Sequence, residues 1–279
     1  MIAGRFAHPT VIGNGAFSRV YSAVDTASNT SVAIKIDVTG QKTGRNNSPL
    51  ILYEAAVLRA LSHIKGIPSV AWTGDIEDDN NKPVPALAMQ ILGNDLENIV
   101  GKKGPLTGYS AAVIARSLFN TIKQVHDSGY LHRDIKPANI MIGAPGDNSV
   151  YICDFGLSKR YLDATGAHIQ NTKKRGVTGT IRYCSPYSHV GEESSRRDDA
   201  VSITYVMISL VTNHLPWQSP PKRSREEIGR IKMMIDPKVL CAGCPAQFQC
   251  VYQAAMKLGF YDTPAYGEMS STLSTVTRS

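Results

Sequence analysis

The chain has 279 residues, and its composition of 42% hydrophobic and 19% charged residues is typical of a folded globular protein and excludes a largely disordered one. The length leaves room for two lobes with separate cores. The formal net charge of +7 favours anionic partners, although dispersed basic residues that only aid solubility would give the same value. Nucleic acid is therefore not the favoured partner.

The sequence predicts neither export nor membrane anchoring. Residues 1–6 carry no apolar signal segment, and Ile2 stands where N-myristoylation requires glycine. The most apolar window, residues 201–211, is far shorter than the ~20 residues of a membrane span and contains Ser202, Thr204 and Ser209, so it predicts a buried helix. Five cysteines without a secretory signal indicate a reducing compartment, cytoplasmic and/or nuclear.

Strand patterns dominate the N-terminal part of the chain. Branched and aromatic residues at 11–12, 20–21 and 32–36 are separated by turn-forming clusters, which predicts a small antiparallel sheet. Residues 50, 53, 54, 57, 58 and 61 follow helical spacing, so one helix is expected to pack on this sheet.

Helical patterns dominate the rest of the chain. A long amphipathic helix is expected from five apolar residues at helical spacing, which are Val113, Ile114, Leu118, Ile122 and Val125. The apolar window at 201–211 predicts a second long helix. Because strands give way to helices near Gly93 and Asn94, the sequence predicts an α+β fold with two lobes and a hinge.

Three cysteines, Cys241, Cys244 and Cys250, are spaced closely enough to raise the question of a metal site. A structural zinc site needs a fourth ligand, and the nearest histidine, His214, lies well upstream, so free thiols in a helical region are favoured. Cys153 is expected to pack as a small hydrophobic residue.

The run His-Arg-Asp-Ile-Lys-Pro-Ala-Asn at 132–139, followed by Asp-Phe-Gly at 154–156, combines a base, a cation and two metal-binding groups. Asp134 can accept the proton of a substrate hydroxyl, and Lys136 can offset charge on a transferring phosphoryl group. Asn139 and Asp154 offer the oxygen ligands that Mg²⁺ prefers. His-Arg-Asp alone is also compatible with a buried ion-pair turn in an α/β protein. Together the two runs resemble the catalytic and metal-binding loops of protein kinases.

Residues 12–20 are similar to the glycine-rich loop of protein kinases. Gly13 and Gly15 would let backbone N–H groups approach phosphates closely, whereas Ser18 stands in place of the third glycine. A Gly-x-Gly alone is also typical of an ordinary hairpin turn. The resemblance implies that Ile12, Gly13, Gly15 and Val20 contact ATP.

In Val-Ala-Ile-Lys-Ile at 32–36, the period of two places the branched residues on one face and Ala33 and Lys35 on the other. This stretch resembles the kinase strand whose lysine binds the nucleotide phosphates, and the resemblance implies that Ala33 and Lys35 contact ATP. Glu54 on the following helix is the expected ion-pair partner of Lys35. A solvated strand lysine and a surface carboxylate are the alternatives.

Residues 87–93 resemble a strand that runs into the interlobe hinge, where kinases bind adenine through backbone groups. By this resemblance Met89 is the gatekeeper, and Gln90 and Leu92 supply backbone hydrogen bonds. A plain core strand fits the composition equally well.

Further stretches resemble the casein kinase 1 family: Thr-Gly-Thr-Ile-Arg-Tyr-Cys-Ser-Pro at 178–186, Ser-Arg-Arg-Asp-Asp at 195–199, Leu-Pro-Trp-Gln at 215–218 and Tyr-Asp-Thr-Pro-Ala-Tyr at 261–266. The sequence departs from the family in Pro-Tyr-Ser-His at 186–189, at Thr204, where glycine is usual, and at Ala138, where aspartate is usual. No catalytic group is lost, so we expect a divergent member.

The resemblance implies a bilobal protein kinase fold, with a β-rich N-lobe at residues 1–92 and a mostly helical C-lobe at 93–279. It implies a serine/threonine protein kinase that uses ATP and Mg²⁺. The implied catalytic residues are Lys35, Glu54, Asp134 and Lys136, and the implied metal ligands are Asn139 and Asp154. A pseudokinase scaffold and a small-molecule phosphotransferase are the alternatives. The sequence makes no prediction of oligomeric state.

Substrate choice is expected to depend on Arg182, because in the family the matching arginine faces an anion near the substrate groove. With help from Lys222, Arg223 or Arg225, it would favour protein substrates that carry a phosphate or acidic residues N-terminal to the target. The basic cluster at 173–175 fits an enzyme that is active without phosphorylation of this segment, or one that awaits a phosphate there.

Overall fold

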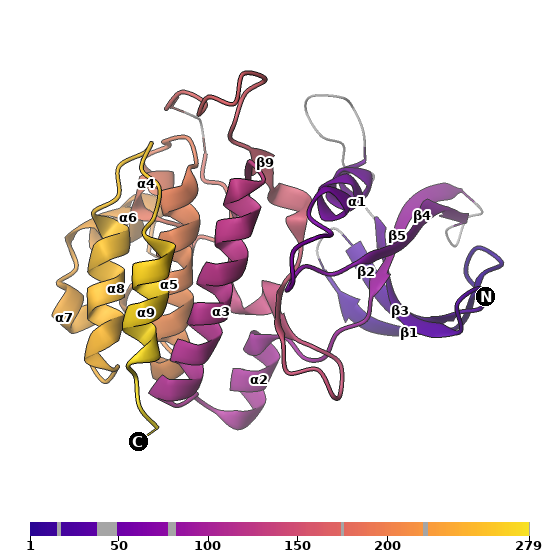
Figure 1. The fold of residues 1–279 in the computed structure, drawn as a ribbon, viewed down its shortest axis with the longest axis horizontal. Coiled ribbons are helices and arrows are strands. Elements are labelled where there is room, and N and C mark those ends of the chain that lie inside the picture. Colours follow the sequence, from indigo (N-terminus) through magenta and orange to yellow (C-terminus); the bar gives the residue numbers. More distant parts are fainter. Residues whose placement is uncertain (16–17, 38–48, 78–81, 174–175, 220–222, 279) are drawn as a thin grey trace. The chain divides into compact units, whose positions relative to one another are not determined.

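The computed structural model describes residues 1–15, 18–37, 49–77, 82–173, 176–219 and 223–278 (Figure 1). The chain divides into two compact units, each built from more than one segment. The first unit comprises Met1–Gly93, Gly143–Ser149 and Cys153–Gly156, and the second comprises Asn94–Ile142, Val150–Ile152 and Leu157–Ser279. Strands dominate the first and helices the second, which confirms the predicted α+β fold.

The first unit is built on an antiparallel sheet with the strand order β1-β2-β3-β5-β4 (Figure 1). Its strands are β1 (Phe6–Asn14), β2 (Ser18–Asp25), β3 (Thr30–Asp37), β4 (Val70–Glu77) and β5 (Pro83–Gln90). The three strands expected near residues 11–12, 20–21 and 32–36 are therefore confirmed, and β5 contains most of the strand expected at 87–93.

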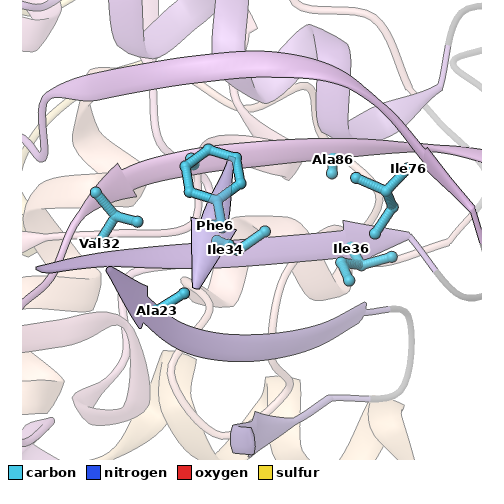
Figure 2. Packing of buried hydrophobic residues seen from close by; sticks show 8 residues of the cluster. Phe6, Ala23, Val32, Ile34, Ile36, Ile76 and Ala86 are labelled. Atoms are coloured by element: carbon cyan, nitrogen blue, oxygen red, sulfur yellow. The ribbon is translucent and has the colours of Figure 1, made fainter. Parts of the chain in front are cut away.

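One face of this sheet carries the apolar core of the first unit. Val32, Ile34 and Ile36 are at most 9% exposed and pack with Phe6 and Ile76 (Figure 2). Because successive side chains of a strand point to opposite faces, burial of these three residues directs Lys35 to the other face, as the sequence predicts.

The predicted helix of the first unit is α1 (Leu50–Ala60), which packs against β3, β4 and β5. Its buried residues include Val57 and Leu58, which have apolar side chains, and also Glu54, whose carboxylate lies within hydrogen-bond distance of Lys35. A buried glutamate is costly unless it is paired, so the position of Glu54 depends on the lysine of β3.

The second unit is mainly helical. Its described helices are α2 (Leu96–Lys103), α3 (Gly108–Asp127), α4 (Pro186–His189), α5 (Arg196–Thr212), α6 (Arg225–Met234), α7 (Pro237–Leu240), α8 (Ala246–Met256) and α9 (Tyr266–Ser274). Two short strand pairs accompany them, β6 (Tyr130–Leu131) with β9 (Lys159–Arg160) and β7 (Ile140–Ile142) with β8 (Val150–Ile152). The single-turn helices η1 (Pro137–Asn139) and η3 (Pro216–Gln218) also belong to this unit, whereas η2 (Phe155–Leu157) spans the boundary between the units.

The two long helices predicted from apolar periodicity are α3 and α5. Helix α3 buries Ile114, Leu118, Ile122 and Val125, but Val113 is 43% exposed, because it lies one residue away from the buried stripe. Helix α5 is buried nearly all round and packs against α3 and α8 (Figure 1). Within the described ranges, no helix combines the length and apolarity that a membrane span requires.

Candidate active-site residues

An ion-pair cluster centred on Lys35 lies in the first unit, and its Glu54 member is buried. The Nζ atom of Lys35 is 2.7 Å from Oε2 of Glu54 and 3.0 Å from Oδ1 of Asp154. Strand β3 supplies the lysine, α1 supplies Glu54, and the segment 153–156 supplies Asp154. The structure therefore brings together three predicted site residues that are widely separated in the sequence, and Glu54 is not the surface carboxylate of the alternative interpretation.

The electrostatics of this cluster keep Lys35 charged. Burial by itself would lower the pKa of Lys35, but the carboxylates of Glu54 and Asp154 raise it above the ordinary lysine value. Burial raises the pKa of Glu54, and the charge of Lys35 only partly opposes this effect. The Asp154 carboxylate is 45% exposed and so remains in contact with solvent.

Asp154 has a φ of 63°, which is uncommon for a residue other than glycine. Such strained backbone is found preferentially at functional sites, where the surrounding structure holds a side chain in a required orientation. The strain supports a functional interpretation of the Asp-Phe-Gly run.

The glycine-rich stretch joins β1 to β2. A side chain at Gly13 would meet only Val20 at ordinary contact distance, and the N–H of Gly15 donates to the carbonyl of Ser18 at 2.8 Å. Neither glycine has a positive φ. Packing and backbone conformation therefore do not require glycine at position 13. Close approach of a ligand to the backbone is another physical reason for a glycine at this position.

The other residues expected to contact the nucleotide also belong to the first unit. In the register of β3 and β5, Ala33 lies opposite Met89. The N–H of Gln90 donates to the carbonyl of Ser69 at 2.9 Å, so this backbone N–H is already used within the first unit. Leu92 follows the end of β5. Hydrogen bonding of Gln90 and Leu92 to adenine stays a prediction.

A second cluster of predicted residues surrounds Asp134 in the second unit. Lys136 Nζ is 2.8 Å from Asp134 Oδ2, and the amide of Asn139 donates to the carbonyl oxygen of Asp134 at 2.9 Å and to Oδ2 at 3.2 Å. The backbone N–H and hydroxyl of Thr180 donate to Asp134 Oδ1 at 2.8 and 2.7 Å. Because the Asn139 donors are directed at Asp134, the atom that Asn139 offers to a cation is its Oδ1.

Thr180 is a member of this cluster that sequence reasoning did not assign to the site, although it lies within the quoted stretch at 178–186. The residue before it, Gly179, has a φ of +86°, and a Cβ at this position would collide with the carbonyl oxygen of Arg133. Only glycine permits this approach. Gly179 therefore allows Thr180 to reach Asp134.

The backbone of the loop that contains Asp134 is held by Asp199, from α5. Its carboxylate accepts from the N–H groups of His132 and Arg133, both at 2.8 Å, and lies 2.9 Å from His126 Nε2. Burial by itself would raise the pKa of Asp199. The pKa is nevertheless lower than that of an ordinary aspartate, chiefly because of the hydrogen bond and charge of His126. The other ring nitrogen of His126 lies 2.5 Å from the hydroxyl of Tyr266.

Two of the three departures from the casein kinase 1 pattern, those at 186–189 and at Thr204, make local contacts in the second unit. Tyr187, in α4, stacks against the guanidinium of Arg197, whose central carbon lies 3.5 Å from the ring centroid. Its hydroxyl donates to the carbonyl of Met256 at 3.1 Å. The hydroxyl of buried Thr204 donates a hydrogen bond to the carbonyl of Val201 at 2.7 Å. Both departures are therefore accommodated within the second unit.

Arg182, the predicted anion-binding residue, has an exposed side chain and lines a cavity of about 160 Å³ in the second unit. Glu97 and Gln218 also line this cavity. Arg223 donates instead to the carbonyl oxygen of Pro216 at 2.9 Å, and Arg225 is the first residue of α6. Lys222 lies outside the described residues, as do residues 174 and 175 of the basic cluster.

The cysteines are free thiols. Within the described ranges, no group of three His, Cys, Asp or Glu side chains is arranged to hold a metal ion. Burial raises the pKa of Cys241 to about 12 and that of Cys244 to about 11. Cys153 is only partly buried by neighbouring residues, and burial likewise raises the pKa of its thiol.

The family model described as protein kinase domain matches residues 6–250, which is most of the chain. The chain therefore belongs to the protein kinase domain family, and its mixed α+β architecture is a kinase fold. Membership of this family supports ATP binding and phosphotransfer to proteins.

Proposed function

We propose that this chain is an active serine/threonine protein kinase, a divergent member of the casein kinase 1 family, that transfers the γ-phosphate of ATP to protein side chains. The observation that carries the proposal is the buried ion pair between Lys35 and Glu54, with Asp154 on the same lysine. A pseudokinase scaffold would not need to keep two carboxylates around a desolvated lysine, because that arrangement is costly unless it has a use.

The residues of the first unit suit the placement of a nucleotide. We assign residues 1–92 as the nucleotide-binding lobe, in which Lys35 binds phosphates, Gly13 and Gly15 admit them close to the backbone, and Met89 is the gatekeeper. Ile12, Val20 and Ala33 are assigned to the adenosine contacts, with Gln90 and Leu92 as backbone partners. The ammonium of Lys35 stays charged beside the two carboxylates, and a cation at this position suits a phosphate ligand.

Asn139 and Asp154 are the residues that would hold Mg²⁺, because both offer the oxygen donors that this cation prefers. Bound Mg²⁺ neutralises charge on the phosphates during transfer. The donor atoms fit this assignment, since the amide nitrogen of Asn139 is directed at Asp134 and the Asp154 carboxylate is partly exposed.

We assign residues 93–279 as the catalytic lobe, in which Asp134 orients the substrate hydroxyl and accepts its proton. Lys136 offsets the negative charge that develops on the transferring group. The hydroxyl of Thr180 donates to Asp134 Oδ1, which leaves the carboxylate in one orientation. Catalysis by such an arrangement comes mostly from positioning and charge stabilisation.

For substrate choice, we assign Arg182 as an anion site that favours acidic or phosphate-primed protein substrates. Support comes from its exposure and from its place on a cavity whose volume could admit an anionic group. Glu97 on the same cavity carries a negative charge that opposes anion binding, so the proposal depends on the guanidinium of Arg182 outweighing it. Arg223 is not expected to contribute, because its guanidinium bonds to the backbone.

The test is to incubate the purified chain with Mg-ATP and either casein or an array of acidic and phosphate-primed peptides. Phosphate on serine or threonine supports the proposal. Nucleotide binding without transfer to any protein or peptide would favour the scaffold, and transfer to a small alcohol alone would favour the small-molecule phosphotransferase.

A further inference from the structure

Lys232, in α6, is a fully buried lysine that lies outside both candidate clusters. Its Nζ donates to the carbonyl oxygens of Ile181 at 2.6 Å and Cys184 at 2.7 Å. It also lies 5.3 Å from the ring centroid of Tyr205 and 5.0 Å from that of Trp217. Among the described residues, no carboxylate lies within ion-pair distance of it, so its charge is stabilised by carbonyl dipoles and aromatic faces.

The two carbonyl oxygens belong to a tight turn at residues 180–184. The N–H groups of Tyr183 and Cys184 both donate to the carbonyl of Thr180 at 2.9 Å, and Trp217 Nε1 donates to the carbonyl of Arg182 at 2.8 Å. The backbone of the turn is therefore anchored inward by donors from η3 and α6. The side chains of Ile181 and Arg182, by contrast, are exposed.

The first residue of the same turn holds the proposed catalytic base. Thr180 donates twice to Asp134 Oδ1, and its hydroxyl also accepts from Lys136 at 3.1 Å. A displacement of the turn would move Thr180 and the exposed Arg182 together. Small errors in the placement of catalytic groups cause large losses of rate.

We propose that Lys232 is a positioning residue for the protein substrate, and that its buried ammonium holds the 180–184 turn so that Thr180 orients Asp134 and Arg182 faces the cavity. This inference rests on the proposed kinase activity. A lysine is suited to the task because one ammonium can donate to two carbonyls at once.

The charge state of Lys232 gives this proposal a distinctive pH dependence. Burial lowers the pKa of Lys232 to about 8. The titratable groups near it are Cys184 and Tyr205, whose pKa values burial raises, and His189, whose pKa burial lowers to about 4. Of these groups, Lys232 is therefore the one that loses its charge as the pH rises through 8.

The titration of Lys232 affects turnover and the free energy of unfolding in opposite directions, so the two effects can be distinguished. Because the pKa of Lys232 is lower in the folded chain than in the unfolded chain, its contribution to the free energy of unfolding increases as the pH rises above 8. Loss of charge nevertheless weakens its bonds to the two carbonyls, since charge-assisted hydrogen bonds are the stronger ones. A positioning role predicts that turnover falls above pH 8 while this residue's contribution to stability does not.

The experiment compares Lys232→Met, which keeps the approximate volume of the side chain, with Lys238→Met on the exposed surface of α7. Peptide phosphorylation is measured from pH 6.5 to 9.5 and normalised to the number of nucleotide-binding sites. We expect Lys232→Met to lower peptide kcat at pH 7.5 at least tenfold, to leave the KM for ATP within twofold, and to lose the decline above pH 8. Lys238→Met should match the parent.

Two measurements keep the proposal testable if Lys232→Met folds poorly or the parent is inactive. Trp217→Phe removes the N–H donor to the Arg182 carbonyl but retains an aromatic ring, and should lower peptide kcat at least threefold with unchanged nucleotide affinity. Hydrogen exchange at the Tyr183 and Cys184 amides should be at least tenfold faster in Lys232→Met, or in Trp217→Phe if only that variant folds. This second readout does not depend on activity.

Unchanged turn exchange in the variant would overturn the positioning role, whether or not the chain is an active kinase. Equal losses of peptide kcat in Lys232→Met and Lys238→Met, or a decline above pH 8 that persists in Lys232→Met, would also overturn it. A parent chain that transfers no phosphate would refute the proposed function instead, and faster exchange in Lys232→Met would then support only the anchoring of the turn by Lys232.

Discussion

Asp134 illustrates how much of a proposed catalytic role depends on single atoms. One carboxylate oxygen accepts from Thr180 and the other lies next to Lys136 and Asn139, so the side chain is fixed on both sides. An amide in its place would keep the shape of the residue but would lose both the negative charge and the capacity to accept a proton.

Asp134→Asn is therefore expected to reduce turnover on the order of 10²–10⁴-fold while nucleotide binding persists. Steady-state phosphorylation of a peptide, combined with a nucleotide-binding titration, measures both quantities. Asp127→Asn, which changes an exposed carboxylate at the end of α3, is the control. Phosphate transfer by Asp134→Asn at the parent rate would disprove the catalytic assignment.

Arg182 carries the prediction about substrate choice. Its planar guanidinium can bind phosphate oxygens in a bidentate manner, and hydrogen bonds to charged groups contribute about 1.5–3 kcal/mol, which corresponds to roughly tenfold to a hundredfold in preference. Arg182→Ala should reduce the rate on a phosphate-primed peptide selectively and should leave the rate on the matched unprimed peptide nearly unchanged.

The control for this comparison is Arg230→Ala, which removes an equal charge from the exposed side of α6. Rates are measured at low salt, because screening weakens exposed charge interactions. An equal fall on both peptides in Arg182→Ala, or the absence of any primed preference in the parent, would show that this chain lacks the proposed anion site.

At the scale of elements, the segment that follows the Asp-Phe-Gly run is held by one ion pair and one hydrogen bond to residues outside it. Lys159, in β9, is 2.8 Å from the buried carboxylate of Glu193, and Arg133 donates to the carbonyl of Leu157 at 2.6 Å. A carboxylate of the chain itself therefore neutralises a basic residue that could otherwise attract a phosphate.

This arrangement predicts an enzyme that is active without phosphorylation of the segment. Phosphatase treatment of the purified chain should change the peptide phosphorylation rate by less than twofold, and Glu193→Gln should lower it because Lys159 loses the charge of its partner. Complete loss of activity on dephosphorylation, with recovery on rephosphorylation, would refute the prediction.

The N-terminus of α5 carries a second prediction at the scale of elements. Asp198 accepts from the N–H of Ser195 at 2.7 Å and from the hydroxyl of Ser185, yet burial raises its pKa to about 6. Since the folded chain then holds this proton more tightly than the unfolded chain, ionisation of Asp198 destabilises the fold as the pH rises from about 4 to 6.

Asp198→Asn should remove this contribution. Compared with the parent, the variant should show a free energy of unfolding that decreases less between pH 4 and 6, by on the order of 3 kcal/mol over the interval. Denaturant titrations at three pH values measure the difference, with Asp127→Asn as the control. Identical pH slopes in parent and variant would contradict the assignment.

At the scale of the whole molecule, ligand binding and folding are linked. A ligand that binds only the folded chain at a concentration of 100 times its Kd raises the free energy of unfolding by about 2.7 kcal/mol. Mg-ATP is therefore expected to raise the melting temperature by several degrees.

Lys35→Met should abolish this rise, because Lys35 is the proposed phosphate ligand and its loss leaves Glu54 buried without a cation. Asp134→Asn should retain the rise. Thermal unfolding with and without Mg-ATP tests both expectations. A rise of the same size in Lys35→Met would show that the nucleotide is bound elsewhere or by other groups.

The sequence by itself was sufficient for β1, β2, β3 and most of the last strand of the sheet, β5, but not for β4. It was also sufficient for α1, α3 and α5, and for Glu54 and Asp154 around Lys35 and Lys136 and Asn139 around Asp134. Apolar periodicity reports which face of an element is buried, and the kinase motifs report which residue types accompany one another. The burial of Val32, Ile34 and Ile36 opposite Lys35 follows directly from such a pattern.

Only the tertiary structure decided which distant groups meet. Three contacts join residues that are far apart in the chain. Thr180 donates to Asp134, His126 lies next to Tyr266, and Lys232 donates to the 180–184 turn. Local patterns contain no information on such pairings, because a lysine within a helix has the same local sequence signature whether it is solvated or buried beneath a turn. What distinguishes Lys232 is its set of partners, and these depend on how α6, η3 and the turn pack together.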